Sequence, residues 1–304
     1  MKDIVSVITS FYDTEDYILQ CINSVNNQLT NENFLIEYIL IDDCSTDSTK
    51  EIIDLYFDQY KNENVIVKKL KTENNVGPGC AKKLGIEQAT GNYFMFLDAD
   101  DYYIKNDFIL RAYTTITENN VDIVEYGIRL TNERGIREEI VSSQSLIIEN
   151  NKESNLLAIF YSGLIKFMPW SKIIKREIVK SKEYDNDKQF DDIRTIPYWA
   201  YNANRIIIEN TVEVNYRNKL NSIVRNNSLE TRLGTVGSIA SLFEDFKDNK
   251  SILKAMYDRC LLDLRTMLDL DSNNEYFRKM SKLNTYMLSY IYPDNYKEIT
   301  YDVE

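Results

Sequence analysis

Residues 93–101 have the sequence YFMFLDADD, an apolar run that ends abruptly in aspartates. A continuous apolar run of this kind is typical of a strand that is buried on both faces of a parallel sheet. Ligands bind at the carboxyl ends of the strands in open α/β sheets, which is where this acidic segment stands. Alternation along an extended chain puts Asp98 and Asp100 on one side, where two carboxylates repel each other unless a cation lies beside them.

Carboxylate oxygens in this arrangement suit Mg²⁺ or Mn²⁺. An acidic turn that caps the next helix explains residues 98–101 equally well when the segment is considered alone. A second acidic pair, Asp42-Asp43, follows the apolar residues 38–41 in the same way. Because two strand ends both carry acidic pairs, the sequence favours a negatively charged mouth that binds a cation.

The first 125 or so residues alternate short apolar runs with amphipathic segments, which is the pattern of βαβ units around a mostly parallel sheet. Helical spacing predicts helices over 18–25, from about residue 49 with Ser48 and Glu51 as a capping box, and over 80–89 with Gly91 as its C-terminal glycine. Residues 229–292 are predicted to form a helical tail. The predicted strands are 4–9, 38–41, 65–70, 93–97, 122–126 and 205–208.

The chain has 304 residues, a net charge of −12 and a sequence pI of about 4.8. This charge repels phosphate backbones, so a nucleic-acid partner is disfavoured. The sequence has no histidine, which excludes Ser-His-Asp, Cys-His and HExxH chemistry and leaves acid–base work to other side chains. Neither a signal peptide nor an apolar run long enough to span a bilayer is apparent. A cytoplasmic location is therefore expected, and a peripheral position at the inner membrane face is left open.

The chain resembles the family 2 glycosyltransferases of the GT-A fold. Four of that family's motifs occur in its order within about residues 1–130, and weaker landmarks extend the resemblance to about residue 225. The motifs are residues 5–13, 41–47, 75–82 and 91–101, and the landmarks are Trp170-Ser171-Lys172, Asp191-Asp192 and residues 216–223.

The resemblance implies an α/β fold of the GT-A type, with a Rossmann-like, mostly parallel central sheet flanked by helices and a C-terminal helical extension. It implies a catalytic domain over 1–225, divided into a nucleotide-sugar-binding part (1–128) and an acceptor-binding part (129–225), followed by the extension over 226–304. The implied activity is inverting, metal-dependent transfer of a sugar from a nucleotide-diphosphate donor, above all a UDP-sugar, to a hydroxyl. A glycan, a wall polymer or a glycoprotein would be the acceptor.

The resemblance also implies roles for individual residues. Tyr12 would stack on the nucleotide base, and Asp43 would bind the edge of the base. Asp98 would bind the ribose or diphosphate side, and Asp100 would be the principal ligand of Mn²⁺ or Mg²⁺. The implied nucleotide-sugar set is completed by Ser10, Asp13, Lys82, Ala99 and Trp170.

The sequence departs from the family pattern in three places. Lys82 and Lys83 stand where the family usually has arginine and asparagine, so which lysine faces the diphosphate is left open. Lysine also lacks the bidentate fork of arginine. Ser10-Phe11 replaces the usual Pro-Val or Pro-Thr, and no histidine is present to complete a metal shell.

An inverting transfer needs a carboxylate that takes the proton of the acceptor hydroxyl. The Asp191-Asp192 pair matches the family's Glu-Asp landmark, so Asp192 is the predicted base and Asp191 its support. A helix N-terminus, whose dipole favours acidic residues, explains the same pair, and the two interpretations can coexist.

Several alternatives are open from sequence alone. Trp170 suits a sugar platform and a core position equally well, and Arg217, Lys219 and Arg225 are most simply a solvated basic face. A catalytically silent nucleotide-sugar-binding partner in a glycosylation complex is the main alternative function. Nucleotidyl transfer onto a sugar phosphate is disfavoured, because residues 9–13 lack the Gly-rich loop that this class carries after its first strand. The apolar helical tail is a candidate either to pack on its own catalytic domain or to form a homo-oligomer interface.

Overall fold

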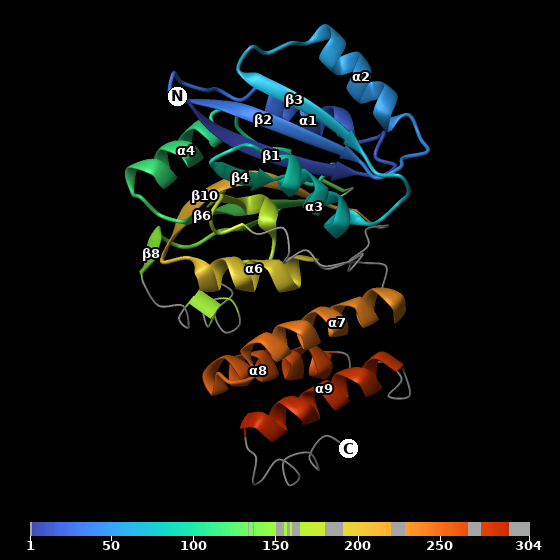
Figure 1. Cartoon of the computed structure of the whole chain (residues 1–304), viewed down its shortest axis with the longest axis vertical. Coiled ribbons are helices and arrows are strands. Elements are labelled where there is room, and N and C mark those ends of the chain that lie inside the picture. The colour runs from blue at the N-terminus through green and yellow to red at the C-terminus, as the bar shows by residue number, and fades with distance from the viewer. Residues whose placement is uncertain are drawn as a thin grey trace.

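The computed structural model describes the chain over a set of ranges that covers the whole predicted sheet and most of the helical tail. These ranges are residues 2–132, 134–135, 137–149, 155–156, 159, 165–179, 191–219, 229–266 and 275–291. They form a central sheet with helices on both faces and a group of helices beyond one face (Figure 1). This arrangement confirms the predicted α/β class and the C-terminal helical extension.

One sheet of ten strands runs through the molecule in the order β3-β2-β1-β4-β9-β6-β10-β5, with β7 paired to β6 and β8 paired to β10. The strands β1 to β4 are parallel to one another, whereas β9 runs antiparallel between β4 and β6. The strand bounds are β1 Asp3–Phe11, β2 Phe34–Asp42, β3 Val65–Lys71, β4 Tyr93–Phe96, β5 Tyr102–Tyr103, β6 Ile123–Asn132, β7 Arg137–Ile140, β8 Leu146–Glu149, β9 Lys172–Lys175 and β10 Arg205–Asn218.

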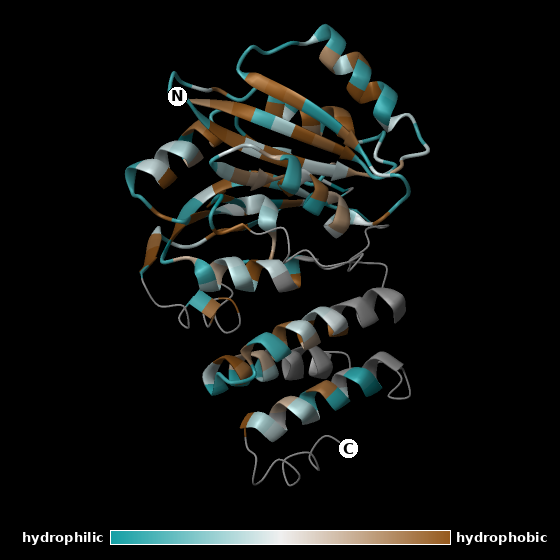
Figure 2. Cartoon of the chain, viewed as in Figure 1, coloured by the Kyte–Doolittle hydropathy of each residue, from teal (hydrophilic) through white to brown (hydrophobic). Residues whose placement is uncertain are grey.

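Two hydrophobic cores lie on opposite faces of this sheet. One joins the sheet to α1 (Ile18–Asn26), α2 (Thr49–Gln59) and α4 (Phe108–Glu118). The other joins it to α3 (Pro78–Gln88) and α6 (Asp191–Asn202), and continues into α7 (Leu229–Phe246), α8 (Lys250–Thr266) and α9 (Glu275–Ile291). Much of the central sheet is correspondingly hydrophobic in Figure 2.

Two predicted capping signals are wrong, although α2 begins at Thr49 as predicted. Ser48 makes no side-chain capping bond, and its N–H is bound by Glu15 Oε2 at 3.0 Å instead of by Glu51. Asp47 takes over the cap, because its Oδ1 accepts the N–H of Thr49 at 3.0 Å. Gly91 does not end α3, which stops at Gln88. It lies against β1, where a Cβ would stand 2.4 Å from Ser6 Oγ.

The predicted domain boundary at residue 225 lies outside the described residues, so the division into domains stays a prediction. The helices on either side of it are in place, since α7 begins at Leu229 and α9 ends at Ile291. Within the described ranges, no helix combines the length and the apolar character needed to cross a membrane.

Candidate active site

The ends of β1, β2 and β4 lie side by side at one edge of the sheet. The register places Phe11 opposite Asp42 and Ile8 opposite Phe96. Pairing continues past the strands, because the N–H of Asp43 donates to Phe11 O at 2.8 Å and the N–H of Leu97 donates to Ile8 O at 3.0 Å. The acidic segments at the ends of β2 and β4 and the loop that follows β1 therefore lie next to one another at the same edge of the sheet.

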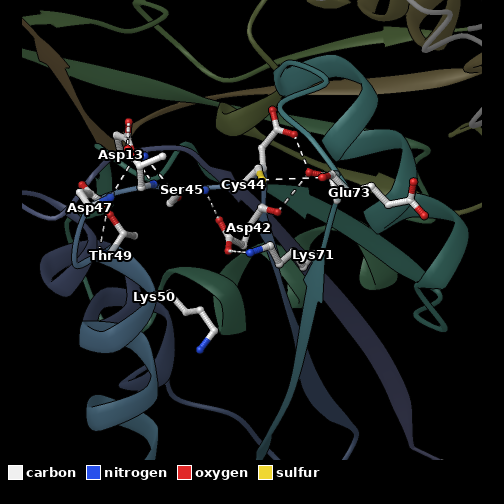
Figure 3. Close-up of polar contacts among 12 residues, drawn as sticks. Asp13, Asp42, Cys44, Ser45, Asp47, Thr49, Lys50, Lys71 and Glu73 are labelled. Atoms are coloured by element: carbon white, nitrogen blue, oxygen red, sulfur yellow. Dashed lines mark hydrogen bonds and ion pairs between the residues drawn. The ribbon is translucent and has the colours of Figure 1, made fainter.

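The loops after β1 and β2 are tied together by carboxylates that accept main-chain N–H groups (Figure 3). Asp13 Oδ1 accepts the N–H of Thr46 at 2.7 Å and that of Asp47 at 3.3 Å. In return, Asp47 Oδ2 accepts the N–H of Glu15 at 3.0 Å. Asp13 has a φ of 48°, the left-handed conformation that aspartate tolerates better than most residues.

This pair of loops presents Tyr12 at the mouth, where the residue is 45% exposed. The negative charge of Asp13 raises the pKa of the Tyr12 phenol. Ser10, the last residue but one of β1, is half-buried beside it. An exposed aromatic ring on a braced loop offers a surface for stacking, and the implied contact of Tyr12 with a base stays a prediction.

Asp43 is buried and binds its own chain. Its Oδ1 accepts Thr72 Oγ1 and the N–H of Val76, both at 2.9 Å, and its Oδ2 accepts the N–H of Gly77 at 2.8 Å. Gly77 has a φ of 88° and directly precedes Pro78, the first residue of α3. Asp43 thus fixes the loop that leads into α3, and its predicted contact with a base edge stays a prediction.

The acidic segment after β4 is a turn, not a continuation of the strand. β4 ends at Phe96, and the N–H of Asp101 donates to Asp98 O at 2.9 Å. Burial still alternates along the turn: Asp98 and Asp100 are half-buried, whereas Ala99 is 4% exposed and Asp101 is wholly buried. The two outer carboxylates thus share the accessible side, as predicted.

Each carboxylate of this turn has a cationic or main-chain partner. Lys82 of α3, which is 6% exposed, places its Nζ 3.3 Å from Asp98 Oδ1. Asp101 Oδ1 accepts the N–H of Arg217 at 2.8 Å, which ties the turn to the end of β10. Burial, followed by the charges of Asp100 and Asp98, raises the pKa of Asp101 well above its usual range.

The end of β10 supplies two further cations to this turn. Arg217 Nη1 donates to Asp100 O at 2.6 Å, and Lys219 Nζ lies 2.6 Å from Asp100 Oδ2. Their expected position on a solvated basic face is wrong, because both side chains fold back over the acidic turn. Arg225 lies outside the described residues. Sequence alone carries little signal for this contact, since more than a hundred residues separate the two segments.

Trp170 is 3% exposed and stacks on Tyr216 of β10, with ring centroids 5.3 Å apart and an interplanar angle of 9°. Tyr216 is the half-buried member of this pair, and the sequence indicated it only as part of a weak landmark. Burial raises the pKa of Tyr216, and the charges of Asp101, Asp98, Asp100 and Asp192 raise it further. The charges of the acidic turn and of Asp192 thus act on the same phenol.

A buried ion group supports the Trp170 segment. Lys172 of β9 faces Glu125 of β6 in register, with Lys172 Nζ 3.2 Å from Glu125 Oε2, and both side chains are buried. Lys172 Nζ also donates to Lys166 O at 2.8 Å and Met168 O at 2.7 Å. Burial lowers the pKa of Lys172 to about 8.

Asp191 and Asp192 occupy the first turn of α6, so the helix N-terminus interpretation is confirmed. Asp192 is half-buried, and its Oδ1 accepts the N–H of Ile193 at 2.9 Å. The side chain of Asp191 lies outside the described residues. The role of Asp192 as a base is compatible with this position and stays a prediction.

The carboxylates of the acidic turn fit a divalent cation that is coordinated mainly by groups from outside the protein. Asp98 and Asp100 offer hard, half-exposed carboxylate oxygens of the kind that Mg²⁺ and Mn²⁺ prefer. Among the described residues, no group of three or more His, Cys, Asp or Glu side chains converges on one point. Such a cation would take one or two ligands from the protein and the others from phosphate and water.

Comparison with known proteins gives the chain a family. The model of glycosyl transferase family 2 matches residues 6–181. Glycosyltransferase GlyG of Streptococcus pneumoniae is 30% identical over 233 residues, which cover 74% of this chain and 74% of that protein. Poly(ribitol-phosphate) β-N-acetylglucosaminyltransferase TarS of Staphylococcus aureus is 32% identical over 213 residues, 67% of this chain. The match spans only 33% of the length of TarS.

Solved structures show the same fold. The crystal structure of Staphylococcus aureus TarS in complex with UDP-GlcNAc has a TM-score of 0.69 and 20% sequence identity, and the match covers 96% of this chain and 82% of that one. The family match covers more than half of the chain, and the 30% identity with GlyG over 74% of the chain agrees with it. The chain belongs to glycosyl transferase family 2.

Proposed function

We propose that this glycosyltransferase moves a sugar, with inversion, from a UDP-sugar to a hydroxyl of a glycan or cell-wall polymer. Asp100 would hold a divalent cation, and Asp192 would act as the general base. The observation that carries the proposal is the acidic turn after β4, where the half-buried Asp98 and Asp100 lie at the same sheet edge as the exposed Tyr12.

The donor end of the site is built on the loops after β1 and β2. Tyr12 would stack on the base, and Ser10 would lie beside it. Asp13 contributes by holding the loop, since its oxygens already accept N–H groups from Thr46 and Asp47. Asp43 acts in the same way on the loop that begins α3, which carries Lys82. Lys82 would be the cation that meets the diphosphate, and its ion pair with Asp98 supports this choice over Lys83.

The chemical step needs one bond formed, one broken and one proton moved. The acceptor oxygen attacks the anomeric carbon as the bond between that carbon and the diphosphate oxygen breaks, and UDP leaves with the electron pair. The carboxylate of Asp192 takes the proton of the acceptor hydroxyl. A divalent cation bound at Asp100 would supply charge stabilisation to the leaving diphosphate. Trp170 is buried, so the half-buried Tyr216 is the better candidate for contact with a sugar ring.

Two donors should be tried first. TarS is named as an N-acetylglucosaminyltransferase of poly(ribitol phosphate), and a Bacillus spizizenii relative that is 32% identical over 180 residues is named as a glucosyltransferase of the same polymer. We therefore propose UDP-GlcNAc and UDP-glucose as donors and a polyol-phosphate wall polymer as the first acceptor to test. The match covers only 26% of the Bacillus protein, so the acceptor-binding parts of these relatives need not be shared.

The test separates transfer from binding. The Asp192→Asn variant should lose transfer, with kcat reduced by about a hundredfold or more, while calorimetry still detects UDP binding with unchanged affinity. The Asp100→Asn variant should lose both transfer and the dependence of UDP binding on Mn²⁺. Asp58→Asn, an exposed change on α2, serves as the matched control.

Transfer by Asp192→Asn at the wild-type rate would refute the role of this residue as the base. If the wild-type protein binds UDP but turns over no donor in a panel of nucleotide sugars, the silent binding partner becomes the better account.

A further inference from the structure

The chain already holds a cation at the carboxylate expected to bind a metal. Lys219 Nζ lies 2.6 Å from Asp100 Oδ2, and the two side chains are only 23% and 26% exposed. By comparison, the other outer carboxylate of the turn, Asp98, is 3.3 Å from Lys82 Nζ. Among the described residues, Lys219 is therefore the cation that pairs with the carboxylate of Asp100, whereas Arg217 binds the main-chain oxygen of that residue.

The position of Lys219 is built by three separate segments. Its ammonium lies over the ring of Tyr17, with Nζ 4.4 Å from the ring centroid, just before α1. Arg217 braces that ring from β10, because its guanidinium lies 5.2 Å from the Tyr17 centroid and 5.0 Å from the centroid of Tyr102 in β5. Arg217 also donates to Gln20 Oε1 of α1. An ammonium that is paired with a carboxylate and covered by an aromatic face is held on two sides.

We propose that Lys219 is the built-in counter-ion of Asp100 in the donor-free enzyme, and that a divalent cation must displace it. A cation and an ammonium on one half-buried carboxylate repel each other, so their occupancies compete. The diphosphate of the donor removes this conflict, because it ligates the cation and gives the displaced ammonium a new anionic partner. Metal and nucleotide diphosphate therefore bind cooperatively, and Lys219 sets the strength of that coupling.

This inference rests on the proposed function for the identity of the diphosphate, but its core can be tested without turnover. Mn²⁺ binding to the full chain is measured by electron paramagnetic resonance, with and without UDP. Lys219→Met should bind Mn²⁺ alone about tenfold more tightly than the wild type, a typical size for coupling between sites. UDP should then improve Mn²⁺ binding less in this variant than in the wild type.

Three controls make the result decisive. Lys219→Arg keeps the positive charge and should bind Mn²⁺ as weakly as the wild type. Asp100→Asn combined with Lys219→Met should lose the gain, which locates the ion. Lys247→Met removes a lysine paired with Glu244 on α7 and should change nothing. Near-ultraviolet circular dichroism checks that each variant is folded.

Equal Mn²⁺ affinity of the wild type and Lys219→Met without nucleotide would overturn the proposal, and so would a gain that survives the Asp100→Asn change. Failure of the proposed transferase activity would leave these binding results standing. Conversely, a transferase in which Lys219→Met has no effect on metal binding would overturn only the counter-ion role.

Discussion

At the scale of single residues, much of the site's shape is set by carboxylates that bind main-chain N–H groups. Asp13 and Asp43 both follow strands, and each accepts hydrogen bonds from a loop that a later part of the sequence supplies. Such charge-assisted bonds are stronger than bonds between neutral groups. A carboxylate offers two acceptor oxygens, whereas an amide of the same shape offers one and has donors in place of the other.

Asp43→Asn tests this role directly. The amide offers one oxygen, and its NH₂ group would face N–H donors, so at least one of the bonds to Val76 and Gly77 is lost. We expect the free energy of unfolding to fall by about 1–3 kcal/mol. Urea denaturation measures it, with Asp58→Asn as the exposed control. An unchanged midpoint would show that this loop is held by other contacts.

The buried Lys172 predicts an unusual pH dependence of stability. Burial lowers its pKa to about 8 in the folded protein from an ordinary value of 10.5. Between these two values the unfolded chain binds the proton that the folded chain has released, so this group makes stability rise with pH. Below about pH 8 both states are protonated, and this contribution is constant.

Lys172→Met should therefore flatten the slope of unfolding free energy against pH above about pH 8, relative to the wild type. Each unit of pKa shift corresponds to about 1.4 kcal/mol, and the comparison between the two proteins cancels the titration of other groups. Guanidinium denaturation at several pH values measures the slopes. Identical slopes would place the folded-state pKa of Lys172 near its ordinary value.

At this scale the sequence predicted that acidic residues lie at the ends of the strands, but it did not predict which cationic side chains pair with them. The acidic turn and Tyr12 could be found because strand ends are visible in the apolar pattern. The partners Arg217 and Lys219 could not, since they approach from a strand more than a hundred residues later. Trp170 was equally compatible with a platform and with a core position, because composition does not fix which face of an aromatic ring is covered.

At the scale of elements, the strands with long apolar runs were predictable, and the short ones were not. All six predicted strands are present, whereas β5, β7, β8 and β9 have only two to four residues each. The strand β9 matters most, because it runs antiparallel between β4 and β6 and carries Lys172 into the core. Its four residues, Lys172–Lys175, include two lysines. Because central strands are usually apolar, this composition does not indicate one.

Gly91 lies where the turn before β4 packs against β1. The sequence did not reveal this contact, because a glycine at this position also suits the end of α3. A Cβ at this position would stand 2.4 Å from Ser6 Oγ and 2.8 Å from Ile4 O, and the main chain of β1 cannot easily yield. Gly91→Ala should therefore lower the free energy of unfolding by about 1–3 kcal/mol.

Gly237 of α7 is the matched control, since a Cβ there meets nothing within 4 Å. Gly237→Ala should raise stability by about 0.5–1 kcal/mol, because alanine suits a helix interior better than glycine. Thermal denaturation compares the two variants. A stabilised Gly91→Ala protein would mean that β1 and the turn before β4 separate at little cost.

At the scale of the whole molecule, α6 joins the sheet to the C-terminal helices. Trp199 of α6 stacks on Phe96 of β4, with ring centroids 5.5 Å apart. On its other side, Tyr201 meets Phe246 of α7 at 5.0 Å between centroids. The helix whose first turn carries Asp192 is thus packed between both parts (Figure 1). The helical tail was predictable from its periodicity, and packing on its own domain was one of the two alternatives that the sequence left open, whereas its role in oligomers stays a prediction.

Phe246→Ala tests whether the two parts unfold together. Removing this buried ring should cost about 3–5 kcal/mol. If α6 couples the parts, differential scanning calorimetry should show the single transition of the wild type shifted downwards or split in two, with the helical part melting first. Leu55→Ala, at a position 61% exposed on α2, should leave the transition unchanged. A single unshifted transition in the Phe246 variant would show that the ring contributes little to the contact.

The bracing of the loops after β1 and β2 has a consequence for sequence divergence. Thr46, Asp47 and Ser48 donate to this bracing through their main-chain N–H groups, which every residue except proline possesses. Position 48 in particular can therefore vary during evolution without altering the loop. Asp13 and Glu15 act through their carboxylates and have no such freedom.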